Sequence, residues 1–389
     1  MRKLQGEGDQ FTVEGHRPVM TMKLPQIARR TLRATLVLTT FSLGACALED
    51  EGIDDAFGEV GGDASDETMF RAPGSFPGIA NETQLCTGTI HDGSGAMRYC
   101  RNRSIYSNNS NVTRAIILIH GSGSNAKTQY YDPTIAEALS EGVDLTKTDI
   151  IAPQFFYPES DDPTDQLIYD DWEASNYMLW ENDWRWGGEA STHSRSTFDM
   201  VDHIIEELMD HRPNLEDIVV AGQSAGGQFV ARYSLVTEVS TPGVDVRYWV
   251  ANPSTYLWHD PSRPGPTANC SNFDDYPLGL DDLADNYPYM VGKSATTISH
   301  NAITRDIYWT VGEFDMGGVT TNCRYTAQGV DRHERWENHR QNINDVCNDL
   351  GYGAWFCFWH TARHIEIPGV GHSYVPSLQT DEGREILFD

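Results

Sequence analysis

The chain has 389 residues, with 57 Asp and Glu against 28 Lys and Arg, and its formal net charge is −29 at pH 7. So acidic a chain repels a phosphate backbone, which excludes nucleic acid as a partner. Hydrophobic residues make up 39% of the chain, enough for the core of one large α/β domain or two smaller ones.

The first 45 residues have the pattern of a bacterial export signal. A basic region precedes an apolar stretch at residues 36–43, which is too short to span a bilayer as a mature helix. The tetrad Leu-Gly-Ala-Cys that ends at Cys46 resembles a lipobox, in which the cysteine becomes the lipidated N-terminus after cleavage. We expect an exported lipoprotein of the outer membrane or cell surface, held at the membrane only by lipid on Cys46. A plain secretory signal is the alternative.

An acidic stretch at residues 46–73 follows the signal and contains few large apolar side chains. Segments of this kind bury too little apolar surface to fold. We therefore expect a disordered tether over residues 46–73 and a folded domain over residues 74–389.

Six cysteines follow Cys46, an even number that suits disulfide bonds in an exported protein. Closeness in the sequence favours Cys86–Cys100 and Cys347–Cys357, which leaves Cys270–Cys323, although six cysteines allow other pairings. No C-x-x-C pair or His/Cys cluster has zinc spacing, so neither a metal nor another cofactor is expected.

Strand-like and helix-like stretches alternate along the predicted domain, which is the pattern of an α/β protein. After a hairpin at 84–106, buried strands are predicted at 114–119, 149–155, 218–221, 246–251, 307–311 and 363–367. Helices are predicted at 134–139, 196–211 and 328–349. Residues 257–301 form an insertion rich in Pro, Asp and Tyr.

Aromatic residues gather in an irregular stretch at 157–195, which contains Trp172, Trp180, Trp184 and Trp186. A satellite core would account for them, and so would the aromatic wall of a binding cleft. As candidates for substrate binding we take Trp186, which precedes two glycines, and Tyr256, which follows the strand at 246–251.

The strand at 218–221 leads into a turn at residues 222–226, with the pattern G-x-S-x-G, and then into residues with helical spacing. Strand, turn and helix in this order form a nucleophile elbow, whose strained backbone lifts the hydroxyl of Ser224 clear of the sheet. Gly222 and Gly226 supply the small residues that the turn needs. A glycine-rich turn with an ordinary serine is the alternative.

Two further residues complete a possible triad. Asp315 and His372 each follow a predicted strand, in the order serine, acid, histidine that catalytic triads of this kind of sheet show. Glu313, two residues before Asp315, is an alternative acid. Two other histidines on the predicted polar helix are expected to be solvated, namely His333 and His339.

These motifs resemble the α/β-hydrolases and fall in that superfamily's order across about residues 110–375. The motifs are His120-Gly121, the G-x-S-x-G turn, Gly312-Glu313-Phe314-Asp315 and Gly369-Val370-Gly371-His372. More narrowly, the chain is similar to a group of secreted, mostly uncharacterised hydrolases of fungi and bacteria. The residues that carry this narrower likeness are 252–256, 276–280, Cys323 and 328–332.

The resemblance implies an α/β-hydrolase fold, with a mostly parallel central sheet flanked by helices and a cap-like insertion at 257–301. It also implies that the backbone N–H groups of Ser122 and Ala225 form an oxyanion hole beside the triad.

The activity that the resemblance implies is that of an extracytoplasmic serine esterase, which cleaves a carboxylic ester through an acyl-enzyme. The ester would belong to a small molecule or to a polymer. The alternatives are a serine peptidase of the same fold and a catalytically silent surface binding protein.

Overall fold

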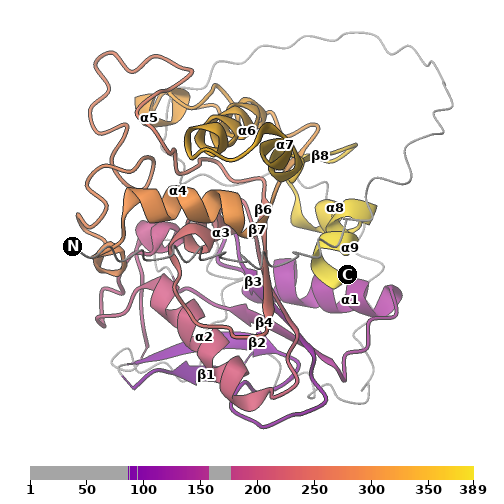
Figure 1. Cartoon of the computed structure of the whole chain (residues 1–389). Helices are drawn as coiled ribbons and strands as arrows, with labels where there is room; N and C mark the ends of the chain where they lie inside the picture. Colours follow the sequence, from indigo (N-terminus) through magenta and orange to yellow (C-terminus); the bar gives the residue numbers. More distant parts are fainter. Residues whose placement is uncertain (1–85, 87, 94, 157–176) are drawn as a thin grey trace, which may run out of the picture. The chain divides into compact units, whose positions relative to one another are not determined.

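An eight-stranded sheet forms the centre of this computed structural model, which describes residues 86, 88–93, 95–156 and 177–389. The strand order is β1-β2-β4-β3-β5-β6-β7-β8 (Figure 1). β2 pairs antiparallel with both β1 and β4, whereas every pairing from β4 through β8 is parallel. The mostly parallel sheet is therefore confirmed. The strands are β1 (Gly88–His91), β2 (Ala96–Arg101), β3 (Arg114–Ile119), β4 (Thr148–Pro153), β5 (Asp217–Gln223), β6 (Asp245–Ala251), β7 (Asp306–Gly312) and β8 (His364–Ile367).

Helices follow most of the parallel strands. The longer ones are α1 (Asp132–Ser140), α2 (Thr197–His211), α3 (Ala225–Val236), α4 (Ala295–Thr304), α6 (Arg332–Asp349), α7 (Ala354–Thr361) and α9 (Asp381–Phe388). The shorter ones are the π-helix η3 (Ala126–Tyr131), the 3-10 helices η4 (Asn182–Trp186) and η5 (Pro288–Met290), α5 (Cys323–Thr326) and α8 (Tyr374–Leu378).

The side chains of the central strands alternate between two cores. Ile117 and Ile119 of β3 belong to one core, which α2, α3, α4 and α6 cover, while Ile116 and Leu118 belong to the other, which α1, α8 and α9 cover (Figure 1). Because successive residues of a strand face opposite sides, a sheet covered on both faces needs apolar residues at nearly every position. This explains why the strands appear in the sequence as unbroken apolar runs.

Helix ends follow from local capping. Ser196 precedes α2 and accepts a hydrogen bond from the Asp199 N–H at 3.0 Å, while the Asp199 carboxylate accepts from the Ser196 N–H at 2.9 Å, which completes a capping box. The predicted helix at 328–349 begins later, at α6, because the Asp331 carboxylate caps the helix by accepting from the Glu334 N–H at 2.8 Å.

The insertion at 257–301 has two parts. Its last residues enter α4, whose apolar side chains, Ile298 among them, belong to the core. The preceding residues are mostly irregular and are fastened to the segment after β7. The fastenings are the Cys270–Cys323 disulfide and a hydrogen bond of 2.9 Å from the Gly265 N–H to the Ala327 carbonyl.

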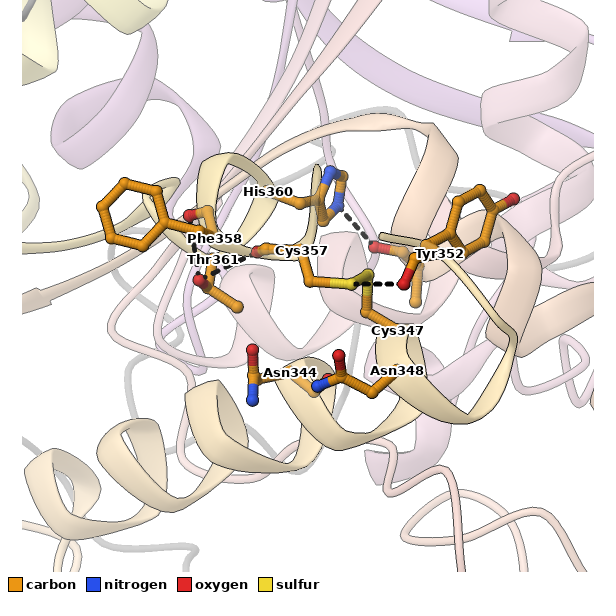
Figure 2. The surroundings of a disulfide bond; sticks show 9 residues. Asn344, Cys347, Asn348, Tyr352, Cys357, Phe358, His360 and Thr361 are labelled. Carbon is orange, nitrogen blue, oxygen red and sulfur yellow. Dashed lines mark hydrogen bonds between the residues drawn. A yellow bond between two sulfur atoms is a disulfide. The ribbon is translucent and has the colours of Figure 1, made fainter. Parts of the chain in front are cut away.

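Two of the three disulfides are those that closeness in the sequence favoured, and the third joins the two cysteines that remained. The disulfides are Cys86–Cys100, Cys270–Cys323 and Cys347–Cys357. The last joins α6 to α7 with both cysteines buried, and Figure 2 shows His360 and Thr361 of α7 beside it. The His360 ring donates from Nε2 to the Ala302 carbonyl at 2.8 Å, which fixes α7 on the end of α4.

His339 is fully buried, so its expected solvation is wrong. Its ring stacks on Tyr256 at 4.1 Å between centroids, and its Nδ1 lies 3.1 Å from Nε2 of His364. The polar sequence of α6 gave no sign that His339 is buried. An imidazole can be buried wherever aromatic rings and a hydrogen-bond partner surround it.

Several predictions concern residues outside the described part of the chain. These are the signal at 1–45, lipid on Cys46, the tether at 46–73, the domain start at 74 and the role of Trp172. Within the described ranges, no helix has the length and apolarity that crossing a membrane requires.

Candidate active site

The turn between β5 and α3 has the geometry of a nucleophile elbow. Ser224 has φ 58° and ψ −117°, a conformation that non-glycine residues rarely adopt. A Cβ on Gly222 would lie 2.3 Å from the Gly226 carbonyl oxygen, and one on Gly226 would lie 2.2 Å from the Ile119 carbonyl oxygen. The pattern G-x-S-x-G therefore reflects steric exclusion of side chains where α3 crosses β5 and β3.

Three side chains from three strand ends form a continuous hydrogen-bonded chain. His372, after β8, places Nε2 2.9 Å from the Ser224 hydroxyl and Nδ1 2.7 Å from Oδ2 of Asp315, after β7. The Asp315 carboxylate has no exposure to solvent. An ionised Asp315 can only accept, so Nδ1 carries the ring proton and Nε2 can accept one from Ser224.

The alternative acid has a different position. The Glu313 carboxylate accepts a hydrogen bond of 2.8 Å from the Gly369 N–H. It therefore fixes the loop that carries His372 and does not contact the imidazole. The structure brings Asp315, and not Glu313, to the histidine.

Burial sets the charge states of the pair. Desolvation lowers the pKa of His372 below its ordinary value, because the imidazolium would lie in a poorly hydrated place. Desolvation also raises the pKa of Asp315, and the Arg332 guanidinium, 3.2 Å from Oδ1, opposes that rise. At neutral pH the arrangement favours a neutral imidazole that can accept a proton.

The candidate oxyanion donors follow neighbouring strands at one edge of the sheet. Ser122 is exposed in the loop after β3, and Ala225 opens α3, where the first N–H groups have no acceptor within the helix. The buried His120 fixes the loop before Ser122. Its Nε2 accepts from the Phe155 N–H at 3.0 Å, so its Nδ1 donates to the Gly121 carbonyl at 2.7 Å. Sequence reasoning noticed His120 only as part of a motif.

Trp186 lies beside the elbow. Its indole N–H is 3.4 Å from Oε1 of Gln228, which stands four residues after Ser224 and so on the same face of α3. The Trp186 carbonyl accepts a hydrogen bond of 2.6 Å from the Tyr276 hydroxyl of the insertion. Trp180 and Trp184 are fully buried against Phe155 and belong to the core.

Tyr256 lies in the core and not on the surface, so its placement does not support substrate contact. Its side chain is fully buried between His339 and Trp309. The sequence made Tyr256 a candidate for substrate binding because it follows the strand that forms β6. The ring instead turns inward under α6, where other aromatic rings surround it.

The residues described by the structure contain no cluster of three or more His, Cys, Asp and Glu side chains that could hold a metal ion. Sequence reasoning did not single out Arg332, which contacts Asp315. The only signal was its place in the segment 328–332, which carried part of the narrower family likeness.

Comparison with protein-family models and with curated proteins finds no match. Among solved structures, the chain is similar to poly(aspartic acid) hydrolase-1 from Sphingomonas sp. KT-1, with 19% identity, a TM-score of 0.51, and coverage of 78% of this chain and 98% of that one. It is also similar to LpqC, a poly(3-hydroxybutyrate) depolymerase from Bordetella parapertussis, with 18% identity, a TM-score of 0.49, and coverage of 75% and 86%. With its sheet order and its elbow, the chain has the α/β-hydrolase fold.

Proposed function

We propose that this chain is an extracytoplasmic serine hydrolase that cleaves carboxylic esters through an acyl-enzyme. The observation that carries the proposal is the hydrogen-bonded chain from Ser224 through His372 to Asp315, which begins at a strained turn. A strained serine conformation has a structural cost, and such strain is found mainly where a function requires it.

The geometry supports a two-step reaction. Ser224 attacks the ester carbonyl while His372 takes its proton at Nε2, and the backbone N–H groups of Ser122 and Ala225 stabilise the oxyanion. His372 then gives the proton to the leaving alcohol, which leaves an acyl group on Ser224. Water, activated by the same histidine, releases the acid and restores the hydroxyl. Asp315 holds the imidazole in the required tautomer throughout.

The surface near the acid favours an uncharged, apolar substrate. Phe314 and Met316, on either side of Asp315, are 63% and 53% exposed. The formal charge of −29 disfavours an anionic polymer such as poly(aspartic acid), on which the Sphingomonas neighbour acts by name. A neutral ester, small or polymeric, fits these features better.

Export is supported by the three disulfides, which form and persist mainly in oxidising compartments. Attachment to a membrane through Cys46 depends on the sequence pattern alone. A Cys46→Ala variant should be found in the soluble fraction and not in the membrane fraction, and its specific activity should be unchanged. A wild-type protein found entirely in the soluble secreted fraction would contradict the anchor.

A fluorophosphonate probe followed by a substrate panel tests the proposal. The probe should label Ser224, and p-nitrophenyl esters should be cleaved much faster than peptide anilides. Preference for the anilides would favour the peptidase alternative. Absence of both labelling and turnover in folded protein would favour the silent binding protein.

A further inference from the structure

The carboxylate of Asp315 has two oxygens, and only one of them faces His372. Oδ2 accepts from His372 at 2.7 Å, while Oδ1 lies 3.2 Å from Nη1 of Arg332. The same guanidinium donates from Nε to the Ser254 hydroxyl at 3.2 Å. Arg332 therefore joins the loop after β6 to the loop after β7, directly behind the acid.

The backbone around Arg332 is fixed. Arg332 is the first residue of α6, its N–H donates to the Gly317 carbonyl at 3.0 Å, and Asp331 caps the helix. Gly317 leaves room for the guanidinium, because a Cβ there would lie 2.7 Å from Nη1 of Arg332. The loop after β7 thus wraps closely around this arginine.

The charges that face Asp315 come from three elements. His372 lies on the loop after β8, while Arg332 and Asp331 lie at the start of α6. Tyr256, on the loop after β6, is also close enough to feel the Asp315 charge, but burial keeps its hydroxyl protonated. Of these groups Arg332 is the permanent cation, because His372 is neutral when it acts as a base.

We propose that Arg332 is a positioning residue, which keeps the buried Asp315 ionised and holds its Oδ2 against His372. A carboxylate without solvent needs an opposite charge or hydrogen-bond donors to stay ionised, since burial favours its neutral form. With Oδ1 held by Arg332, rotation of the carboxylate away from His372 would break an ion pair. The inference rests on the proposed hydrolase function.

The first test compares Arg332→Met with Arg332→Lys. Protonation of the His372–Asp315 pair removes the base, so turnover falls as pH falls. Because a nearby cation disfavours proton uptake, loss of the charge should move the acid limb of kcat/KM upward by about one pH unit or more. Arg332→Met should also lower kcat, on the order of 10- to 100-fold. Losses of this size follow in metal sites when a residue that hydrogen-bonds to a ligand is removed. Arg332→Lys should keep the acid limb near the wild-type pH.

Two pairs of variants control for general damage. Arg363→Met removes a half-buried arginine that pairs with Asp306 at 2.8 Å, and it should leave the pH profile unchanged. Gly317→Ala should displace the guanidinium without removing a charge from the chain, and so should lower kcat. Gly353→Ala is its match, since a Cβ there meets nothing within 4 Å. An unchanged acid limb in Arg332→Met, with normal kcat in Gly317→Ala, would overturn the proposal.

An NMR titration separates this proposal from the hydrolase function itself. With labelled histidine, and His372→Gln to assign the signal, the His372 resonance should titrate at higher pH in Arg332→Met than in wild type. That shift requires no turnover, so it would support the role of Arg332 even if Ser224→Ala kept full activity and the hydrolase proposal failed. A His372 titration unaffected by Arg332→Met would refute the coupling even in an active esterase.

Discussion

The pair formed by His339 and His364 is buried and His372 is half-buried, with 12% of its side chain exposed, yet of these three only His372 has a carboxylate beside it. Burial lowers the pKa of all three imidazoles. In the pair, the ring nitrogens face one another at 3.1 Å, so one ring donates and the other accepts and both are neutral. Low basicity alone therefore does not make a catalytic base. What distinguishes His372 is Asp315 on one nitrogen and Ser224 on the other.

The two settings also differ in what surrounds them. His339 and His364 lie among Tyr256, Trp309 and Trp336, and they contribute to packing. His372 lies at the ends of β5, β7 and β8, where a substrate can meet the serine. The comparison predicts that changes around His372 affect turnover and that changes around the pair affect stability.

The largest expected effect is that of Ser224→Ala. Ester turnover should fall by on the order of 10⁴ or more, because the nucleophile is lost. The melting temperature should not fall, since only a hydroxyl is removed from a turn. Initial rates on a p-nitrophenyl ester and a thermal melt measure both. Near wild-type turnover in folded protein would disprove the elbow assignment.

The next effect concerns the acid. Asp315→Asn should reduce turnover on the order of 10⁴-fold, because an amide does not hold the imidazole in the right tautomer. Glu313→Gln is the matched change, and it should cost far less because Glu313 contacts a backbone N–H. The ranking of kcat/KM in the two variants decides the role, and the reverse order would assign it to Glu313.

Removing two of the disulfides one at a time separates effects on turnover from effects on stability. Replacing Cys270 and Cys323 by Ser frees the insertion from the segment after Asp315, and should lower kcat before the fold is lost. Replacing Cys347 and Cys357 by Ser loosens α7 from α6, the helix that carries His339, and should lower the melting temperature with little change in kcat. Loss of a disulfide costs about 2–5 kcal/mol in small secreted domains, and less is expected in this larger core.

Thiol titration provides the check on those variants. The denatured, unreduced wild-type domain should contain no free thiol among the six paired cysteines. Two or more free thiols per mature chain would rule out the three-bridge arrangement. Equal loss of kcat in both double variants would remove the distinction between the two regions.

The smallest effect is the pH dependence of stability. The folded pKa of His339 and His364 lies below the ordinary value of 6.5, so the unfolded chain binds more protons once pH drops below 6.5. Stability should be fully present above that pH and decline as pH falls further. Melting temperatures between pH 7.5 and 5 should show a slope that His339→Phe reduces. His300→Gln, which changes an exposed histidine, should leave the slope intact.

The sequence by itself determined the strands of the sheet and the elbow, whereas helices α4, α7, α8 and α9 were not predicted. Buried strands covered on both faces must be apolar throughout, and the elbow must have glycine two residues on either side of Ser224. Such requirements act between residues a few positions apart, so they leave a readable local pattern. The positions of Asp315 and His372 after β7 and β8 follow from the same strand pattern.

Only the tertiary structure decided which residues meet across the fold. Glu313 and Asp315 stand two residues apart after the same strand, and the choice between them depends on the loop that carries His372. Tyr256 and His339 were misjudged because their burial depends on each other, from segments far apart in the chain. Arg332 reaches Asp315 only because α6 begins beside the Gly317 loop. Contacts between distant segments are set by packing of the whole core, and no short stretch of sequence records them.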